Sequence, residues 1–183
     1  MATRYRFGDS YIPHFITFSV INWIDALSRP HYKDIVVDSL KYCIANKGLT
    51  IHSWVIMNNH VHMIISAEGD SQLADIVRDF KKFTAAKLLE AVDQSSESRR
   101  SWMMWLFGAA GRANTNNTHY QFWQQDNHPI ALNNHPIAQQ KIDYIHDNPV
   151  RAGIVFAPEH YIYSSAVDYY DIQKGLLPVE LLI

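Results

Sequence analysis

The peptide SWVIMNNHVHMIIS, residues 53–66, constrains the fold more than any other part of the chain. Two apolar runs flank Asn58 and Asn59, and asparagine accepts the positive φ that both central positions of a tight two-residue hairpin turn favour. The peptide therefore predicts two antiparallel strands joined by this asparagine pair, with Met57 opposite His60 at the end of the ladder.

The second strand of this hairpin begins with two histidines one pleat apart, His60 and His62. Strand side chains alternate between faces, so both imidazoles point one way, while Val61, Met63 and Ile65 point the other way into a core. Two imidazoles so placed can chelate one divalent ion, and imidazole suits Mn, Co, Ni or Zn better than Ca. The alternative is a pair of ordinary polar residues on a solvated face, so a second motif has to support the metal site.

That second motif is KIDYIHDNPVRAGIV, residues 141–155. Its apolar spacing predicts a short amphipathic helix that begins after Pro136 and ends near the pair Asn148 and Pro149. Tyr144 and Asn148 are four residues apart, so a phenol and a carboxamide oxygen share one helical face and can reach the same ion. Asn148 has a rival role, because an Asn-Pro pair is also a good N-cap and first turn of a new helical turn. Tyr144 has one too, since most of the 10 tyrosines must be packing residues.

Taken together, MNNHVHMII, KIDYIHDNPVRAGIV and the later YIYSSAVDYY resemble the REP-associated tyrosine transposases, a branch of the single-tyrosine HUH transposases of bacterial insertion sequences. The segments SQLADIVRDFKKFTAAKL and FWQQDNHPIAL extend the resemblance over most of the chain. It implies that His60 and His62 are the HUH metal ligands, that Tyr144 is the nucleophile, and that Asn148 is the third protein ligand. Many relatives have proline where Asn58 stands, which changes the chemistry of the turn and leaves the ligand set intact.

The resemblance also implies an HUH nuclease fold and a metal-dependent transposase that acts on single-stranded DNA next to hairpins. Tyr144 would attack the DNA, become linked to the 5′ phosphate and release a free 3′ hydroxyl. The implied cofactor is Mg²⁺ or Mn²⁺, and the implied partner is single-stranded DNA with a REP-like hairpin, bound by a monomer or a homodimer. Strand transfer through a phosphotyrosine needs no ATP, which agrees with the absence of a nucleotide-binding motif.

Three other functions stay open on the sequence. The first is another HUH nickase, of the relaxase or replication-initiator type, with the same covalent chemistry on different DNA. The second is a hairpin DNA-binding module that does not cleave and forms no adduct. The third is a metal-dependent phosphodiesterase that uses water, with Tyr144 packed in the core.

The order of the predicted elements is strand, helix, strand, strand, helix, strand, which is typical of a ferredoxin-like α+β fold. We therefore expect an antiparallel sheet with helices on one face, with strands at residues 14–21, 51–66 (the hairpin) and 120–124, and helices at residues 31–47 and 71–92. A chain of 183 residues that is 48% hydrophobic can bury one sizeable core, so we predict a single domain over residues 1–183.

Residues 94–118 read as loop around the apolar run WMMWLF, for which we predict core packing beneath a long loop. Stacking of Trp102 or Trp105 on an unpaired base is the alternative. The N-terminus has no targeting segment and no apolar run approaches membrane-spanning length, so we expect a cytoplasmic protein.

The formal net charge of −2 is unusual for a DNA-binding domain, which is generally basic. Contacts to phosphate must therefore come from local clusters. Within the helix at residues 71–92, Arg78, Lys81 and Lys82 fall at helical spacing opposite its apolar face, and so predict a basic stripe. The other predicted DNA-binding residues are Arg4, Arg6 and Arg151. Each cluster also fits an ordinary solvated surface.

Overall fold

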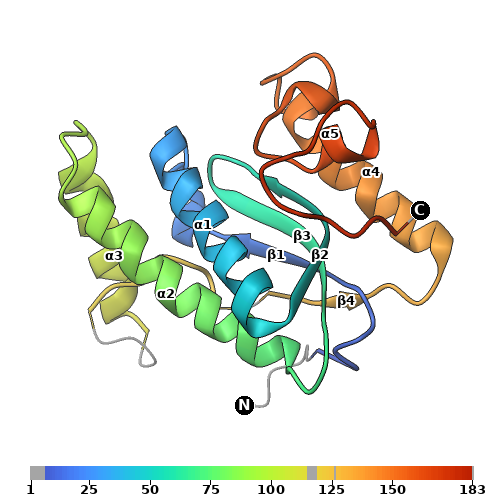
Figure 1. The fold of residues 1–183 in the computed structure, drawn as a ribbon. Coiled ribbons are helices and arrows are strands. Elements are labelled where there is room, and N and C mark those ends of the chain that lie inside the picture. The colour runs from blue at the N-terminus through green and yellow to red at the C-terminus, as the bar shows by residue number, and fades with distance from the viewer. Residues whose placement is uncertain (1–6, 115–118, 126, 183) are drawn as a thin grey trace.

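An antiparallel sheet of four strands, in the order β2-β3-β1-β4, lies at the centre of the computed structural model, which describes residues 7–114, 119–125 and 127–182 (Figure 1). The larger elements follow the chain as β1 (His14–Ser19), α1 (Pro30–Lys47), β2 (Leu49–Ile56), β3 (His60–Ala67), α2 (Leu73–Asp93), α3 (Arg100–Arg112), β4 (Ile130–Ala131), α4 (His135–Arg151) and α5 (Ala166–Tyr169). This strand order and the antiparallel pairing confirm the predicted ferredoxin-like α+β class.

Helices α1 and α2 pack against each other and cover one face of the sheet (Figure 1). Pro30 begins α1 and Gly48, at φ 70°, ends it, which agrees with the predicted helix to within one residue. The apolar face predicted for α2 is buried, and the ring of its Phe80 lies 5.5 Å from that of Phe18 in β1. Phe18 and its partner Val61 in β3 therefore face these helices.

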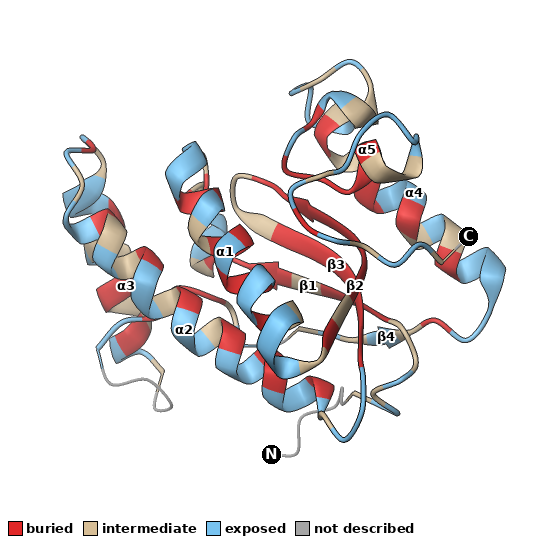
Figure 2. Ribbon diagram, in the orientation of Figure 1, coloured by how far each residue is buried: buried red, intermediate tan, exposed pale blue. Residues whose placement is uncertain are grey.

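Helix α4 packs against β2 and β3 from the opposite face of the sheet. Phe15 and His62, which alternate in their strands with residues that face α2, both contact Tyr144 of α4. On the same helix, the buried His146 bonds through Nε2 to Ser53 Oγ of β2 at 3.2 Å and to Ser165 Oγ at 2.9 Å. Both faces of β2 and β3 are thus covered, and Figure 2 shows both strands as mainly buried.

The turn between β2 and β3 has the predicted length but not the predicted backbone conformation. The Met57 N–H donates to His60 O at 2.8 Å, so Asn58 and Asn59 form a two-residue connection. Neither asparagine has a positive φ, which corrects the predicted turn type. The reason is external support, since the carbonyls of both asparagines accept hydrogen bonds of 2.8 Å from the backbone N–H groups of Leu27 and Val20.

The segment at residues 120–124 does not form the predicted last strand. It runs beside the end of β1 as an irregular edge, with one bridge between Val20 and Trp123 and a hydrogen bond of 2.8 Å from Gln124 N–H to Ser19 O. The regular edge strand is β4, paired with the start of β1. The side chain of Trp123 holds this segment in place, without a ladder of backbone hydrogen bonds. It is buried, and its indole N–H donates to Thr84 Oγ1 at 3.0 Å. β1 itself ends at Ser19 and not at residue 21.

Residues 100–112 form helix α3, where the sequence predicted a loop. The predicted core packing is right for Met103 and Phe107, which are fully buried and lie four residues apart on one helical face. Trp102 and Trp105 point away from that face and are exposed. The spacing of the buried pair was the available signal for a helix, but the serine-rich and glycine-rich flanks read as loop.

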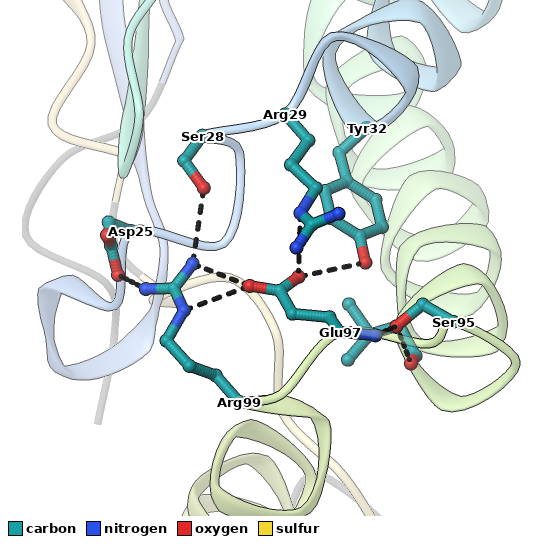
Figure 3. A network of polar contacts seen from close by, with 8 residues as sticks. Asp25, Ser28, Arg29, Tyr32, Ser95, Glu97 and Arg99 are labelled. Carbon is teal, nitrogen blue, oxygen red and sulfur yellow. Dashed lines mark hydrogen bonds and ion pairs between the residues drawn. The ribbon is translucent and has the colours of Figure 1, made fainter.

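A buried carboxylate ties the segment before α3 to the start of α1 (Figure 3). Glu97 is only 6% exposed, and it accepts hydrogen bonds from Tyr32 Oη at 3.3 Å and from the Arg99 guanidinium at 2.9 Å. Arg99 also pairs with Asp25 at 2.6 Å. A buried charge is tolerated when it is paired and hydrogen-bonded in this way. The network holds the connection between Asp25 and α1. Leu27 lies in this connection, and its N–H supports the β2–β3 turn.

Within the described residues, no helix combines the length and the apolar character needed to cross a bilayer.

Candidate metal and nucleophile site

The two histidines at the start of β3 point to the same face of the sheet, as predicted. The ring centroids of His60 and His62 are 4.6 Å apart. His62 is buried and His60 is partly buried, so they do not form the solvated polar face that the sequence left open. Both lie on the face that α4 covers.

Helix α4 brings the second sequence motif onto these histidines. The Tyr144 hydroxyl lies 3.4 Å from His62 Nε2, and the Asn148 side chain lies beside the His60 ring. Tyr144 and His62 are 82 positions apart in the chain. Four residues predicted from two separate motifs thus meet at one place.

The helix does not end at Asn148 and Pro149, which corrects the predicted boundary. It continues to Arg151, and the proline lies within its last turn, where its missing N–H removes a single helical hydrogen bond. Asn148 therefore does not cap a new turn. Its side-chain Nδ2 donates to Tyr144 O at 2.8 Å, within the same helix, and the side chain remains beside His60.

Asn59 fixes the ring of His60. The Asn59 Nδ2 group donates to the backbone carbonyl of Trp23 at 3.3 Å, and this carbonyl can only accept, so the other end of the amide is the oxygen. That oxygen lies 2.6 Å from His60 Nδ1, which must carry the proton and donate it. In the neutral ring the lone pair is then on Nε2, the atom left for a ligand.

His62 has a similar partner on β1. Its Nδ1 shares a hydrogen bond of 2.8 Å with Thr17 Oγ1, and its Nε2 faces the Tyr144 hydroxyl. Burial lowers the pKa of His62 to about 3, with smaller contributions from His60 and Lys141. Burial also lowers the pKa of His60, against a hydrogen bond that the protonated ring can donate to the Asn148 side chain, which raises it. Both rings are therefore neutral near pH 7, which is the form that binds metals.

The donor set fits a divalent ion of the kind that binds imidazole. Each of the two neutral imidazoles is hydrogen-bonded at Nδ1, which leaves its Nε2 as the atom that can bind the ion. Asn148 adds a carboxamide next to His60. In the described part of the chain, no group of three His, Cys, Asp or Glu side chains could hold a metal. The candidate site differs from such groups because its third donor is an amide.

Two cations lie over the ring of the candidate nucleophile. The ammonium of Lys141 is 5.9 Å from the centroid of Tyr144 and 4.6 Å from that of Phe15, and the guanidinium carbon of Arg151 is 5.9 Å from the Tyr144 ring. Tyr144 is 37% exposed, so solvent reaches part of its side chain. The arrangement can attract a phosphate group to the phenol.

Of the predicted DNA-binding residues that the structure describes, only Arg151 lies at this site. Arg4 and Arg6 fall outside the described residues. On α2, Arg78 is paired with Asp75 and Asp79. The Lys81 ammonium donates to the carbonyls of Gln124 and Gln125 and to Asn127 Oδ1, and Lys82 is exposed. Local partners take up two of the three side chains of the predicted stripe, Arg78 and Lys81.

Sequence reasoning missed Asn59 and Thr17 as members of the site. Asn59 was interpreted only as a turn residue, although its place next to His60 was a usable signal. Thr17 gave none, because its contact with His62 depends on the register between β1 and β3, in which these two residues are partners.

The fold is that of a tyrosine transposase. A solved structure described as a REP-associated tyrosine transposase bound to a REP hairpin matches with a TM-score of 0.66, over 97% of this chain and 89% of that chain, at 21% identity. A second, described as a transposase candidate from Deinococcus radiodurans R1, has a TM-score of 0.44 at 16% identity, over 79% of this chain and 97% of that chain. No curated protein matches.

The model of the family described as IS200-like transposases matches residues 16–109, and the chain belongs to this family. It is therefore an enzyme of the transposase class. The matched residues contain His60 and His62 and end before Tyr144 and Asn148, so the roles of α4 are argued from its geometry.

Proposed function

We propose that this protein is a metal-dependent endonuclease and strand transferase that cuts single-stranded DNA next to a hairpin and forms a covalent 5′-phosphotyrosine at Tyr144. The observation that carries the proposal is the distance of 3.4 Å between the Tyr144 hydroxyl and His62 Nε2. It places a reachable phenol beside a histidine whose other ring nitrogen is already held by Thr17. A tyrosine that served only core packing would not need this exposed position.

His60, His62 and Asn148 would hold the divalent ion, for which Mg²⁺ and Mn²⁺ are the candidates. The resemblance to the HUH transposases implies a divalent metal. The chemistry supplied by the bound ion is polarisation of a phosphoryl oxygen and stabilisation of the negative charge that develops there. All three ligands are neutral, so they would leave the charge of the ion undiminished.

The residues of the chain would position the nucleophile and the DNA. The Tyr144 oxygen forms a bond to phosphorus, its proton passes to water, the bond from phosphorus to the 3′ oxygen breaks, and that oxygen gains a proton. Lys141 and Arg151, which lie over the Tyr144 ring, would hold the phosphate. A hairpin substrate is supported by the structure of similar fold, whose description names a REP hairpin.

Asn59→Ala should weaken Mn²⁺ binding and cleavage by about 10- to 100-fold, the usual effect of removing a residue that orients a metal ligand. The variant loses the acceptor that holds the proton on His60 Nδ1. Titration of Mn²⁺ by calorimetry and cleavage rates at increasing Mn²⁺ would measure it. Asn58→Ala is the matched control, because this neighbour bonds to Lys33 and not to a histidine. Equal Mn²⁺ affinities of the two variants would show that Asn59 does not contribute to metal binding.

Lys81 and Lys82 should respond differently to substitution by alanine. Lys82→Ala should weaken DNA binding and reduce the slope of log K against log salt by about one, if the exposed ammonium contacts one phosphate. Lys81→Ala should mainly lower the free energy of unfolding, by about 1–3 kcal/mol, because its ammonium bonds to three acceptors, on Gln124, Gln125 and Asn127. Urea unfolding and binding at several salt concentrations would separate the two effects. An unchanged salt slope for Lys82→Ala would show that Lys82 makes no contact with a DNA phosphate.

A further inference from the structure

An exposed tryptophan lies at the edge of the candidate site. Trp23 is 57% exposed, and its indole packs edge-on against His60 with ring centroids 6.0 Å apart. It belongs to the short 3₁₀ turn Ile21–Trp23, which follows the end of β1. Core packing does not explain a large apolar ring that is exposed to solvent beside a polar site.

The backbone holds Trp23 in an uncommon conformation. Asn22 and Trp23 have φ values of 53° and 55°, a region that bulky residues rarely occupy. The turn is fixed by hydrogen bonds from Trp23 N–H to Val20 O at 3.0 Å and from Asn59 Nδ2 to Trp23 O at 3.3 Å. Such conformations persist where surrounding structure imposes them, and they cluster at functional sites.

Trp23 and Tyr144 lie at the two ends of the histidine pair. Successive ring centroids are separated by 6.0 Å from Trp23 to His60, 4.6 Å from His60 to His62, and 5.1 Å from His62 to Tyr144. Within the described residues, these are the exposed aromatic side chains whose rings contact the candidate metal ligands. A strand whose phosphate reaches Tyr144 across this site would carry a neighbouring nucleotide to Trp23.

We propose that Trp23 stacks on an unpaired base adjacent to the phosphate that Tyr144 attacks, and so sets the register of the cut. The inference rests on the proposed function and adds a positioning residue to it. Stacking on an aromatic ring accepts any base, since each base has a π face, and truncation of such a ring to alanine weakens binding by about 5- to 150-fold. The contact would therefore place the strand without reading its sequence.

The test uses the full chain and a DNA hairpin with a single-stranded tail, in which one abasic site is moved along the tail. Binding is measured in excess chelator, so that it does not depend on cleavage. For the wild type, an abasic site at one tail position should weaken binding by the same factor as Trp23→Ala does on intact DNA. Combining the two changes should add nothing further, because both remove one contact. Trp23→Phe should keep most of the affinity.

Trp105→Ala is the matched control, because Trp105 is 63% exposed but lies on α3, on the other side of the fold from α4 (Figure 1). It should bind and cleave like the wild type. A 2-aminopurine base at the sensitive position should be quenched by the wild type and not by Trp23→Ala, and Trp23→Ala should cut at displaced positions. If Trp23→Ala binds, quenches and cuts like the wild type, the proposal is wrong while the cleavage function stands. If the wild type neither binds nor cuts the tailed hairpin, the proposed function itself fails.

Discussion

Replacement of Tyr144 by phenylalanine should abolish cleavage of single-stranded DNA and leave folding and DNA binding unchanged. Phenylalanine keeps the ring contacts with Phe15 and His62, at centroid distances of 6.1 and 5.1 Å, and removes only the hydroxyl. The hydrogen bond of that hydroxyl to His62 is long at 3.4 Å, so its loss costs little stability. Loss of a nucleophile typically lowers the rate by several orders of magnitude, so cutting should fall below detection.

The measurement is a protein–DNA adduct formed on a hairpin with single-stranded flanks. For the wild type, mass spectrometry should find the 5′ phosphate on Tyr144, and a polymerase should extend the released strand from its 3′ hydroxyl. Tyr163 is the control among the other tyrosines. Burial raises its pKa to about 12 and its hydroxyl donates to Asp34 at 2.9 Å, so it is a poor nucleophile and Tyr163→Phe should still cut.

Each alternative function predicts a different result in this experiment. Continued cutting by Tyr144→Phe would favour a phosphodiesterase that uses water. An adduct on another residue, such as Tyr120, would show that the nucleophile is wrongly assigned. A wild type that binds hairpins without any adduct would be a binding module, and an adduct without strand transfer between hairpin-flanked DNA ends would favour a nickase of the relaxase or replication-initiator type.

Substitution of His62 by alanine should also abolish cleavage, while binding to the hairpin in chelator survives. The change removes the Nε2 atom that would bind the ion beside Tyr144, and it leaves only His60 and Asn148 as protein ligands. Few contacts with phosphate should be lost, because the neutral His62 ring offers no charge to DNA. Calorimetric titration of Mn²⁺ should show the loss of the site, and cleavage should be absent at every Mn²⁺ or Mg²⁺ concentration.

Because His62 is buried, a matched control is needed for the loss of a buried imidazole. His52→Ala supplies it, since His52 is equally buried in the same hairpin but bonds to Ser66 Oγ and to Glu180 O. That variant should lose stability, and it should keep Mn²⁺ binding at temperatures below its unfolding transition. Full activity of His62→Ala, or of the wild type in excess chelator, would contradict the metal site.

Much of the candidate site could be predicted because its pairs are local in sequence. Alternation along a strand places His60 and His62 on one face, and helical spacing places Tyr144 above Asn148. Neither statement depends on the rest of the fold. The order of strands and helices was sufficient in the same way for the ferredoxin-like class, and the matches to an IS200-like family and to a tyrosine transposase fold agree with the resemblance of the motifs.

The sequence was wrong about one turn and about one helix end. The turn at Asn58 and Asn59 has no positive φ, because N–H groups from Val20 and Leu27 hold its carbonyls. The helix continues past Pro149, because a buried proline in the last turn loses only one bond. Lys81 lies at the predicted helical position, and its bonds to Gln124 and Asn127 are a long-range contact that the sequence did not predict.

The sequence by itself determined which side chains share a face within each element, since periodicity requires no tertiary information. Only the tertiary structure decided that α4 lies on the histidine face, at 3.4 Å between Tyr144 and His62. It also decided the ring orientations, because the partners of His60 and His62 are a turn amide and a hydroxyl from a neighbouring strand. Docking, strand register and the orientation of the Asn59 amide, which Trp23 O fixes, depend on contacts between residues far apart in the chain, and no local pattern encodes them.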